Sequence, residues 1–315
     1  MSAQGAVQRP RRGRWTASDR EVLPWVLLFL SPWIIGLIVF TIIPMGWSLW
    51  LSFTDYDPLT RQGDFIGVEN YVDMVGDKRV WTSLYNTVYF TLLYVPLSTI
   101  LGLILALMLN KVGGASAGFF RTAFYLPNLT PAVAVGVLFL LILNGQAGVL
   151  NQFLGIFGIN GPSWLNDTAW VKNGIVLMML WSIGGTVIIY FAALRNVPGE
   201  LYEAAKIDGA GPWKQFLNVT VPMISGALFF TIVINTIYSL QLFSEVWTMF
   251  YGAQQGQGAT GDAALFYVIY LFRNAFEFFK MGYASALAWV LFIVIMLITL
   301  VQLRVSKRFV YYEGE

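Results

Sequence analysis

The stretch Val197-Pro198-Gly199-Glu200-Leu201-Tyr202-Glu203-Ala204-Ala205-Lys206-Ile207-Asp208-Gly209-Ala210-Gly211-Pro212-Trp213 is a polar segment between two long apolar runs. Glu200 and Glu203 fall in the first turn of a short predicted helix, where the helix dipole favours negative charge. Gly209 predicts the end of that helix, because glycine tolerates the left-handed conformation of a helix stop. Pro212 suits the first position of a second short helix. The segment is therefore predicted to be a helical hairpin.

The same hairpin carries side chains that suit a partner surface. Ala204 and Ala205 give the first helix a small face that another backbone could approach closely. A hydrophobic partner could bury the larger apolar and aromatic groups, which are Tyr202, Ile207, Trp213 and Phe216. We therefore interpret the segment as a docking element rather than a catalytic loop.

The composition places the hairpin in a membrane protein. Of the 315 residues, 57% are hydrophobic and only 11% are charged, and the mean hydropathy is +0.65. A soluble domain carries about a quarter charged residues, so a polytopic membrane protein is expected. The sequence has neither Cys nor His. This excludes disulfides and thiol chemistry and removes the usual general base, and we predict no catalytic residue and no metal site.

Six apolar stretches are long enough to cross a bilayer, which takes about 20 residues of helix. They are predicted near Leu23–Phe53, Thr82–Asn110, Ala123–Leu143, Gly174–Leu194, Pro222–Phe250 and Gly282–Leu303. The first is long and carries three prolines, so we expect it to tilt or kink. The predicted fold class is an all-α polytopic membrane protein with six transmembrane helices.

The orientation follows from the distribution of basic residues. Thirteen of the 19 Lys and Arg residues lie on the side that holds both termini and the hairpin. The positive-inside rule therefore predicts that both termini and the hairpin are cytoplasmic. The expected organisation is a basic N-terminal tail over 1–22, a transmembrane domain over 23–304 with its cytoplasmic loop at 195–221, and a C-terminal tail over 305–315.

The hairpin resembles a known family signature. The EAA signature is Glu-Ala-Ala, three residues, Gly, and then a Pro that opens the next membrane helix. It belongs to permease subunits of binding-protein-dependent ABC importers, and the matching residues here are Glu203, Ala204, Ala205, Gly209 and Pro222. Asp208 and Ala210 agree with the carbohydrate-uptake (maltose/sugar-type) branch. Many family members carry a Gly-Gly-Pro turn in the last outer loop, which is missing here.

The resemblance implies a type I ABC importer permease fold in a bacterial or archaeal cytoplasmic (inner) membrane. It implies a second homologous permease, two ATPase copies, an extracytoplasmic sugar-binding protein and a sugar substrate. ATP and Mg²⁺ would bind to the ATPase, and the chain itself contains no Walker-type phosphate-binding motif. The residues implied in coupling to the ATPase are Glu200, Glu203, Ala204, Ala205, Asp208, Gly209 and Trp213.

The fifth apolar stretch concentrates polar residues that suit a substrate pathway, and the candidates are Asn235, Tyr238, Ser239, Gln241 and Glu245. The spacing of Asn235, Tyr238, Leu242 and Glu245 predicts one helix face. A sugar needs hydrogen-bond partners and an aromatic surface, and this face offers both. Counted from the signature, Asn235, Tyr238 and Ser239 fall on positions that line the sugar site in the maltose-type subunits that the chain resembles. Weaker candidates are Asn86, Asn144, Ser182 and Tyr190.

Each of these assignments has an alternative. Polar residues in membrane helices often hold helices together, and for Ser239 and Ser182 we favour that role. Glu245 lies near the outer end of its span, where it could reach water or pair with a partner subunit. A self-sufficient carrier using Glu245 as the coupling carboxylate would need an inverted repeat, and none is apparent. An intramembrane enzyme would need paired acid and base groups. The identity of the sugar stays open.

Overall fold

The structure of the chain is a computed structural model that describes residues 17–112, 114–252 and 261–310. These residues are almost entirely helical, and the β-pairing among them consists of two isolated bridges, Thr54–Phe65 and Asp57–Gln62. Residues 1–16 of the predicted N-terminal tail, the Gly- and Gln-rich segment 253–260 and the last five residues lie outside the described residues, whereas residues 17–22 of that tail are already helical.

The chain divides into two compact units between residues 51 and 52. The first unit consists of α1 (Ala17–Leu37), a π-helix η1 (Ile38–Ile42) and α2 (Ile43–Leu51). Its apolar part, Val22–Leu51, is 30 residues long and could cross a membrane. The irregularity expected from the prolines is a π-turn next to Pro44. A proline ring clashes with the carbonyl four residues earlier, and a wider turn relieves that clash.

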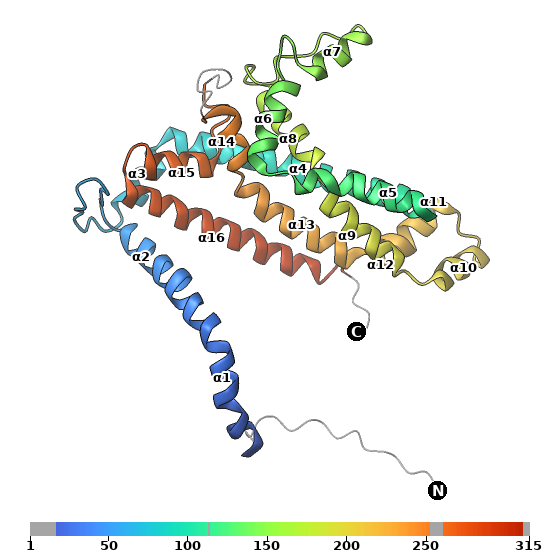
Figure 1. Ribbon diagram of the computed structural model, residues 1–315, viewed down its shortest axis with the longest axis horizontal. Helices are drawn as coiled ribbons and strands as arrows, with labels where there is room; N and C mark the ends of the chain where they lie inside the picture. Colours follow the sequence, from blue (N-terminus) through green and yellow to red (C-terminus); the bar gives the residue numbers. More distant parts are fainter. Residues whose placement is uncertain (1–16, 113, 253–260, 311–315) are drawn as a thin grey trace. The chain divides into compact units, whose positions relative to one another are not determined.

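The second unit is built around two long, unbroken helices (Figure 1). They are α4 (Lys78–Lys111) and α16 (Met281–Ser306), and both can span a membrane. Helix α4 packs against α8, α9, α13 and α15. The core at these contacts is aromatic and fully buried, with Phe90 of α4 edge-on to Phe266 at 5.6 Å between ring centres. The predicted spans Thr82–Asn110 and Gly282–Leu303 are confirmed as continuous helices.

Two predicted spans are each two helices instead of one. The third contains α5 (Gly114–Tyr125) with the 3₁₀-turn η2 (Leu126–Leu129), then α6 (Ala132–Ile142), and the pair is bent by 98°. The fourth contains α8 (Val171–Trp181) and α9 (Gly184–Arg195), bent by 49°. The prediction of single helices over Ala123–Leu143 and Gly174–Leu194 is therefore wrong. In the third span Pro127 and Pro131 explain the bend, because a residue before proline is driven out of the helical region.

The fifth predicted span, Pro222–Phe250, is found as one apolar span over Ser225–Phe250, but its helix is interrupted after Leu240. It contains α12 (Val221–Met223), α13 (Ser225–Leu240) and α14 (Ser244–Phe250). The single helical face expected through Asn235 and Glu245 is therefore wrong, because the helix stops between them. Aromatic packing accompanies the break, since the Phe243 ring lies 5.5 Å from Trp247 and 5.0 Å from Phe272. By length and composition the described chain contains four membrane-spanning helices, or up to six if each bent pair is one span.

The segments predicted as outer loops contain further helices. They are α3 (Glu69–Gly76), α7 (Val149–Ile156) and α15 (Tyr267–Phe276). Asp77 ties three elements together here, because its Oδ2 accepts hydrogen bonds from Tyr270 of α15 at 2.5 Å and Tyr283 of α16 at 2.9 Å. Its Oδ1 accepts from the Arg79 N–H at 2.9 Å and caps α4. Burial raises the pKa of Asp77, but the hydrogen bonds from Tyr270, Tyr283 and the backbone outweigh it and leave the pKa below its usual value.

Candidate functional site

The predicted hairpin is confirmed as two short helices. Helix α10 covers Gly199–Ile207, and α11 (Pro212–Gln215) runs into the π-helix η3 (Phe216–Thr220). Gly209 has a φ of +75°, and Ala210 donates from its N–H to the Ala205 carbonyl at 2.8 Å. This is the left-handed helix stop expected from the sequence. Pro212 is the first residue of α11, as predicted.

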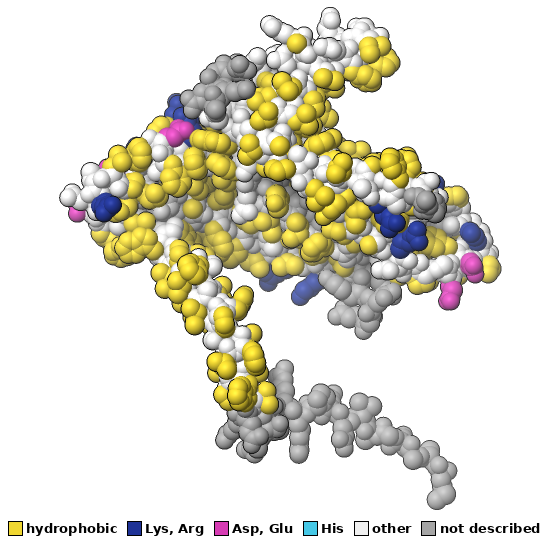
Figure 2. Space-filling view, in the orientation of Figure 1, with side chains coloured by type: hydrophobic (Ala, Val, Ile, Leu, Met, Phe, Trp, Pro, Cys, Tyr) yellow, Lys and Arg dark blue, Asp and Glu magenta, His cyan; other side chains and the backbone are white. Residues whose placement is uncertain are grey.

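Several apolar side chains of the hairpin are exposed to solvent. Ile207 is 87% exposed and Trp213 is 69% exposed, although Trp213 stacks on Phe216 with ring centres 5.4 Å apart. The predicted coupling residues lie on this surface, with Ala205 half-buried and the others exposed: Glu200, Glu203, Ala204, Asp208, Gly209 and Trp213. In Figures 1 and 2, α10 lies at one end of the second unit. Exposed apolar groups rimmed by charge are typical of a protein-binding surface.

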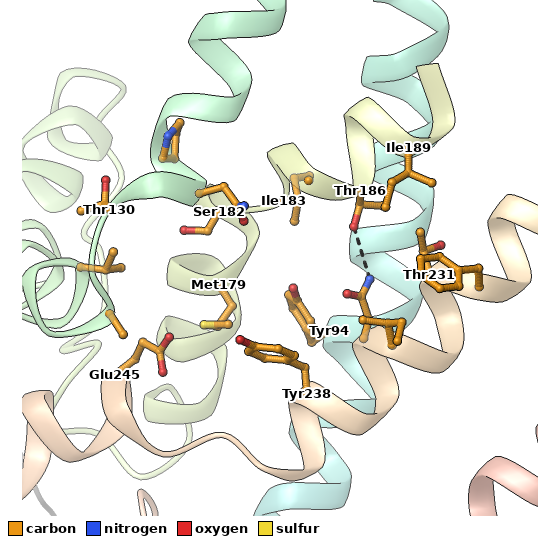
Figure 3. Close-up of a pocket in the computed structure, with 18 residues that line it drawn as sticks. Tyr94, Thr130, Met179, Ser182, Ile183, Thr186, Ile189, Thr231, Tyr238 and Glu245 are labelled. Carbon is orange, nitrogen blue, oxygen red and sulfur yellow. Dashed lines mark hydrogen bonds between the residues drawn. The ribbon is translucent and has the colours of Figure 1, made fainter. Parts of the chain in front are cut away.

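A second candidate site is a pocket of about 440 Å³ inside the second unit. Five helices (α4, α6, α8, α9 and α13) and the start of α14 contribute to its lining. Figure 3 shows polar side chains distributed around this space, with Glu245 at the opposite end from Thr231. Membrane helices bury polar groups only at a cost, so the gathering of polar groups around one cavity makes this pocket a candidate functional site.

Three helix breaks surround the pocket. Asn128 and Thr130 line it from the 98° bend, and Ser182 and Ile183 line it from the 49° bend. The third break, between α13 and α14, lies between the lining residues Tyr238 and Glu245. Irregular backbone is tolerated at membrane depth only where it is buried in protein or lines a cavity. The helix breaks are therefore consistent with the presence of the pocket that they line.

Three of the five predicted pathway residues line the pocket, namely Asn235, Tyr238 and Glu245. Ser239 does not line it. Its side chain is buried, and its Oγ donates to the Thr236 carbonyl at 2.9 Å within α13, so this hydrogen bond does not join α13 to another helix. The helix-contact role favoured above stays a prediction. Gln241 is exposed immediately after α13 and also lies outside the lining.

The weaker candidates separate in the same way. Ser182 lines the pocket, so the structure places it where a substrate role is open. Asn86 is buried and donates to the Asp262 and Leu265 carbonyls at 2.8 and 3.0 Å. The Asn144 side chain accepts from two N–H groups of its own turn. The buried Tyr190 hydroxyl is hydrogen-bonded to Thr231. These last three side chains hold the fold together.

Sequence reasoning missed several polar lining residues, which are Tyr94, Asn128, Thr130, Thr186 and Thr231. They come from four separate elements. They are scattered among apolar residues, and nothing in the sequence shows that these elements meet at one pocket. Thr186 is the clearest case, because it faces Asn235, whose Nδ2 reaches the Thr186 Oγ1 at 3.5 Å and the Ser98 Oγ at 3.3 Å (Figure 3). Both hydrogen bonds are long and therefore weak.

The pocket holds one charged side chain, Glu245, and is otherwise lined by neutral groups. No cluster of three or more acidic residues that could hold a metal ion occurs in the part of the chain that the structure describes. The chemistry available in the pocket is therefore hydrogen bonding by hydroxyls, amides and one carboxylate, beside aromatic rings. This combination suits reversible binding of a polar molecule.

Comparison with known proteins gives the family. Residues 98–311 match the family described as binding-protein-dependent transport system inner membrane component, and this segment includes the hairpin and all of the pocket lining except Tyr94. The chain is 38% identical over 290 residues to the probable ABC transporter permease protein YesP of Bacillus subtilis, covering 91% of this chain and 92% of that one. It is 34% identical over 284 residues to the lactose transport system permease protein LacF of Rhizobium radiobacter, covering 89% and 93%.

The fold agrees with the sequence comparison. A chain of a bacterial ABC transporter that imports the acidic polysaccharide alginate superposes with a TM-score of 0.78 at 23% identity, covering 92% of this chain and 98% of that one. The same importer is known in complex with a periplasmic protein carrying an alginate pentasaccharide. The resemblance read from the hairpin is confirmed, and this chain belongs to the family of inner-membrane permease components of binding-protein-dependent ABC transport systems.

Proposed function

We propose that this chain is the permease subunit of an ABC importer that passes a di- or oligosaccharide from an extracytoplasmic binding protein across the cytoplasmic membrane. The observation that carries the proposal is the hairpin, whose Ile207 and Trp213 are left open to solvent inside the segment that matches the family. The carbohydrate assignment is supported by LacF, which is named for lactose.

The partners in this proposal are a second homologous permease, two copies of an ATPase and the binding protein. ATP and Mg²⁺ bind to the ATPase, and this chain performs no covalent chemistry. Six spans with both termini and the 195–221 loop in the cytoplasm satisfy the distribution of Lys and Arg. The tails over 1–22 and 305–315 then flank a permease domain over 23–304.

The connection between hairpin and pocket follows from chain order. Helix α9 ends at Arg195, shortly before the hairpin, and α12 and α13 follow it. Both α9 and α13 line the pocket, and Thr186 of one faces Asn235 of the other. Closure of the ATPase pair would displace the hairpin and, through these two helices, the walls of the pocket. The sugar would be accepted from the outer side and released inward after hydrolysis.

The proposal is tested by Gly209→Ala in the complete importer. The added Cβ meets no atom within 4 Å, so its effect comes from the positive φ, which costs about 1–2 kcal/mol for a residue with a side chain. We expect the ATPase to co-purify less well and sugar uptake to fall. Gly199→Ala is the matched control, because Gly199 lies in the same hairpin, has open space and lacks a positive φ.

Co-purification and uptake should be measured together for both variants. Full assembly and full uptake in Gly209→Ala would refute the docking role of the hairpin. Uptake by the purified chain alone, with no nucleotide-hydrolysing subunit present, would instead support a self-sufficient carrier.

A further inference from the structure

Glu245 is set apart within the pocket by its charge. The other polar groups of the lining are neutral hydroxyls and amides, and no Lys or Arg is among the lining residues. The carboxylate comes from the first turn of α14, next to the fully buried Val246, so the packing of that helix fixes its position. In Figure 3 the Glu245 carboxylate and the Tyr238 hydroxyl point toward one another across the space.

Glu245 also has no structural task that would explain its charge. The ion pairs of the described residues are Arg79–Asp262 and Arg273–Glu277, and neither involves it. Within that same part of the chain its carboxylate takes no hydrogen bond. A half-buried carboxylate that is held in place but not used by the fold is available to a ligand.

Resting on the proposed function, we propose that Glu245 determines specificity by restricting the pocket to uncharged carbohydrates and excluding acidic sugars. A carboxylate is an acceptor with two oxygens, so it suits the hydroxyl donors of a neutral sugar. Hydrogen bonds to an ionised acceptor are shorter and stronger than those between neutral groups. Tyr238, which is 68% exposed, offers its ring face to the C–H surface of the same sugar.

An acidic sugar meets the opposite situation. Its carboxylate, phosphate or sulfonate would share a pocket of about 440 Å³ with the Glu245 carboxylate and with no cation to offset the repulsion. Like charges repel more strongly beside a protein wall than in bulk water, because the effective dielectric constant there is lower. A permease that handles an anionic ligand would need a neutral or basic side chain in place of Glu245.

The inference is tested by ligand binding to the complete importer in lipid nanodiscs, without the binding protein, which has a selectivity of its own. One probe is a labelled pool of neutral gluco- and galacto-oligosaccharides of two to four units. The other is the same pool after its primary hydroxyls are oxidised to carboxylates. Wild type should bind the neutral pool at least about tenfold more tightly, the factor that corresponds to 1.4 kcal/mol.

The variants give the discriminating results. Glu245→Gln should reduce the preference for the neutral pool about tenfold, Glu245→Lys should reverse it, and Glu245→Asp should retain it. Glu69→Gln is the matched control, because it removes the same charge from an exposed position on α3 outside the pocket. An unchanged preference in Glu245→Gln, or equal binding of both pools by wild type, would overturn the inference.

Two further variants distinguish failure of this inference from failure of the proposed function. Asn235→Ala and Tyr238→Ala should weaken both pools equally. If that loss occurs while the Glu245 variants leave the preference for the neutral pool unchanged, the pocket binds carbohydrate as proposed, but Glu245 does not exclude acidic sugars. If neither pool binds to wild type, or if the Asn235 and Tyr238 variants bind normally, the pocket is not a carbohydrate site. The proposed role of Glu245 in excluding acidic sugars is then wrong as well.

Discussion

The hydroxyl groups of Tyr202 and Thr220 are hydrogen-bonded at 2.9 Å, which joins the first helix of the hairpin to the π-helix that leads back into the bundle. Thr220 is buried, whereas the outer side chains of the hairpin are exposed. The bond therefore closes the base of the hairpin and leaves its tip free for a partner. Under the proposed function, a partner that pushes on the tip would therefore displace the hairpin as a whole.

Tyr202→Phe should loosen this base while keeping the ring. A single hydrogen bond contributes about 0.5–1.5 kcal/mol, so amide hydrogen exchange in α10 should accelerate by about twofold to tenfold. ATP hydrolysis should continue with less sugar moved per ATP. Tyr85→Phe is the control, since it removes a hydroxyl from an exposed tyrosine in the same unit. Unaltered exchange in α10 would contradict this role for the bond.

Asn235→Ala should separate binding from stability. Its two hydrogen bonds, at 3.3 and 3.5 Å, are too long to hold α13 firmly against α4 and α9. Interhelical polar contacts in membranes contribute about 0.6 kcal/mol on average, so the unfolding temperature should fall only slightly. Sugar binding should fall much more. A large loss of thermal stability with normal binding would make Asn235 a helix contact.

Gly184→Ala and Gly185→Ala should differ sharply, although the two residues are neighbours at the start of α9. A Cβ on Gly184 would lie 2.0 Å from the Phe124 carbonyl oxygen, a backbone atom that cannot move aside without shifting α5. On Gly185 the nearest atom would be the Asn128 Nδ2 at 3.6 Å, an ordinary contact. We expect Gly184→Ala to lose about 1–3 kcal/mol of stability and Gly185→Ala to fold normally. Thermal unfolding in detergent checks both.

Asp77→Asn should remove a pH dependence from the stability. The folded pKa of Asp77 lies below its unfolded value, so its carboxylate stabilises the fold above the unfolded pKa of about 3.9 and loses that effect as the pH falls through the folded pKa. The advantage of wild type over Asp77→Asn should therefore be full at pH 6 and shrink below about pH 4. Tryptophan fluorescence during thermal unfolding at several pH values measures it. A constant difference across that range would contradict the assignment.

The long spans and the hairpin could be predicted because their signals are local. Continuous apolar runs predict α4 and α16, and the Gly209 and Pro212 pair predicts the two short helices of the hairpin. The bend at Pro127–Pro131 was present in the sequence as two prolines, but hydropathy alone passes over them. The break before Glu245 has no Pro or Gly at all. It accompanies packing of Phe243 against Phe272, a residue 29 positions away that no local pattern connects to it.

Only part of the lining of the candidate pocket could be predicted from the sequence, for a related reason. Asn235, Tyr238 and Glu245 were found because they crowd into one segment, where polarity stands out against an apolar background. Thr130 and Thr186 lie in segments with few polar residues, and nothing in the sequence shows that the bends bring those segments to the same pocket as Asn235. The prediction of one continuous face through Leu242 was wrong because it assumed an unbroken helix, although both ends of that face do line the pocket.

If the chain transports a sugar as proposed, the interrupted helices around the pocket would also determine which parts of it can move separately. A continuous helix moves as one rigid element, whereas the two halves of an interrupted helix can rotate separately. Helices α4 and α16 are continuous, whereas α8 and α9, and α5 and α6, are separated by bends beside the pocket. Under the proposed function, α4 and α16 would stay in place while the bent pairs pivot, so that one side of the pocket would open while the other stays closed.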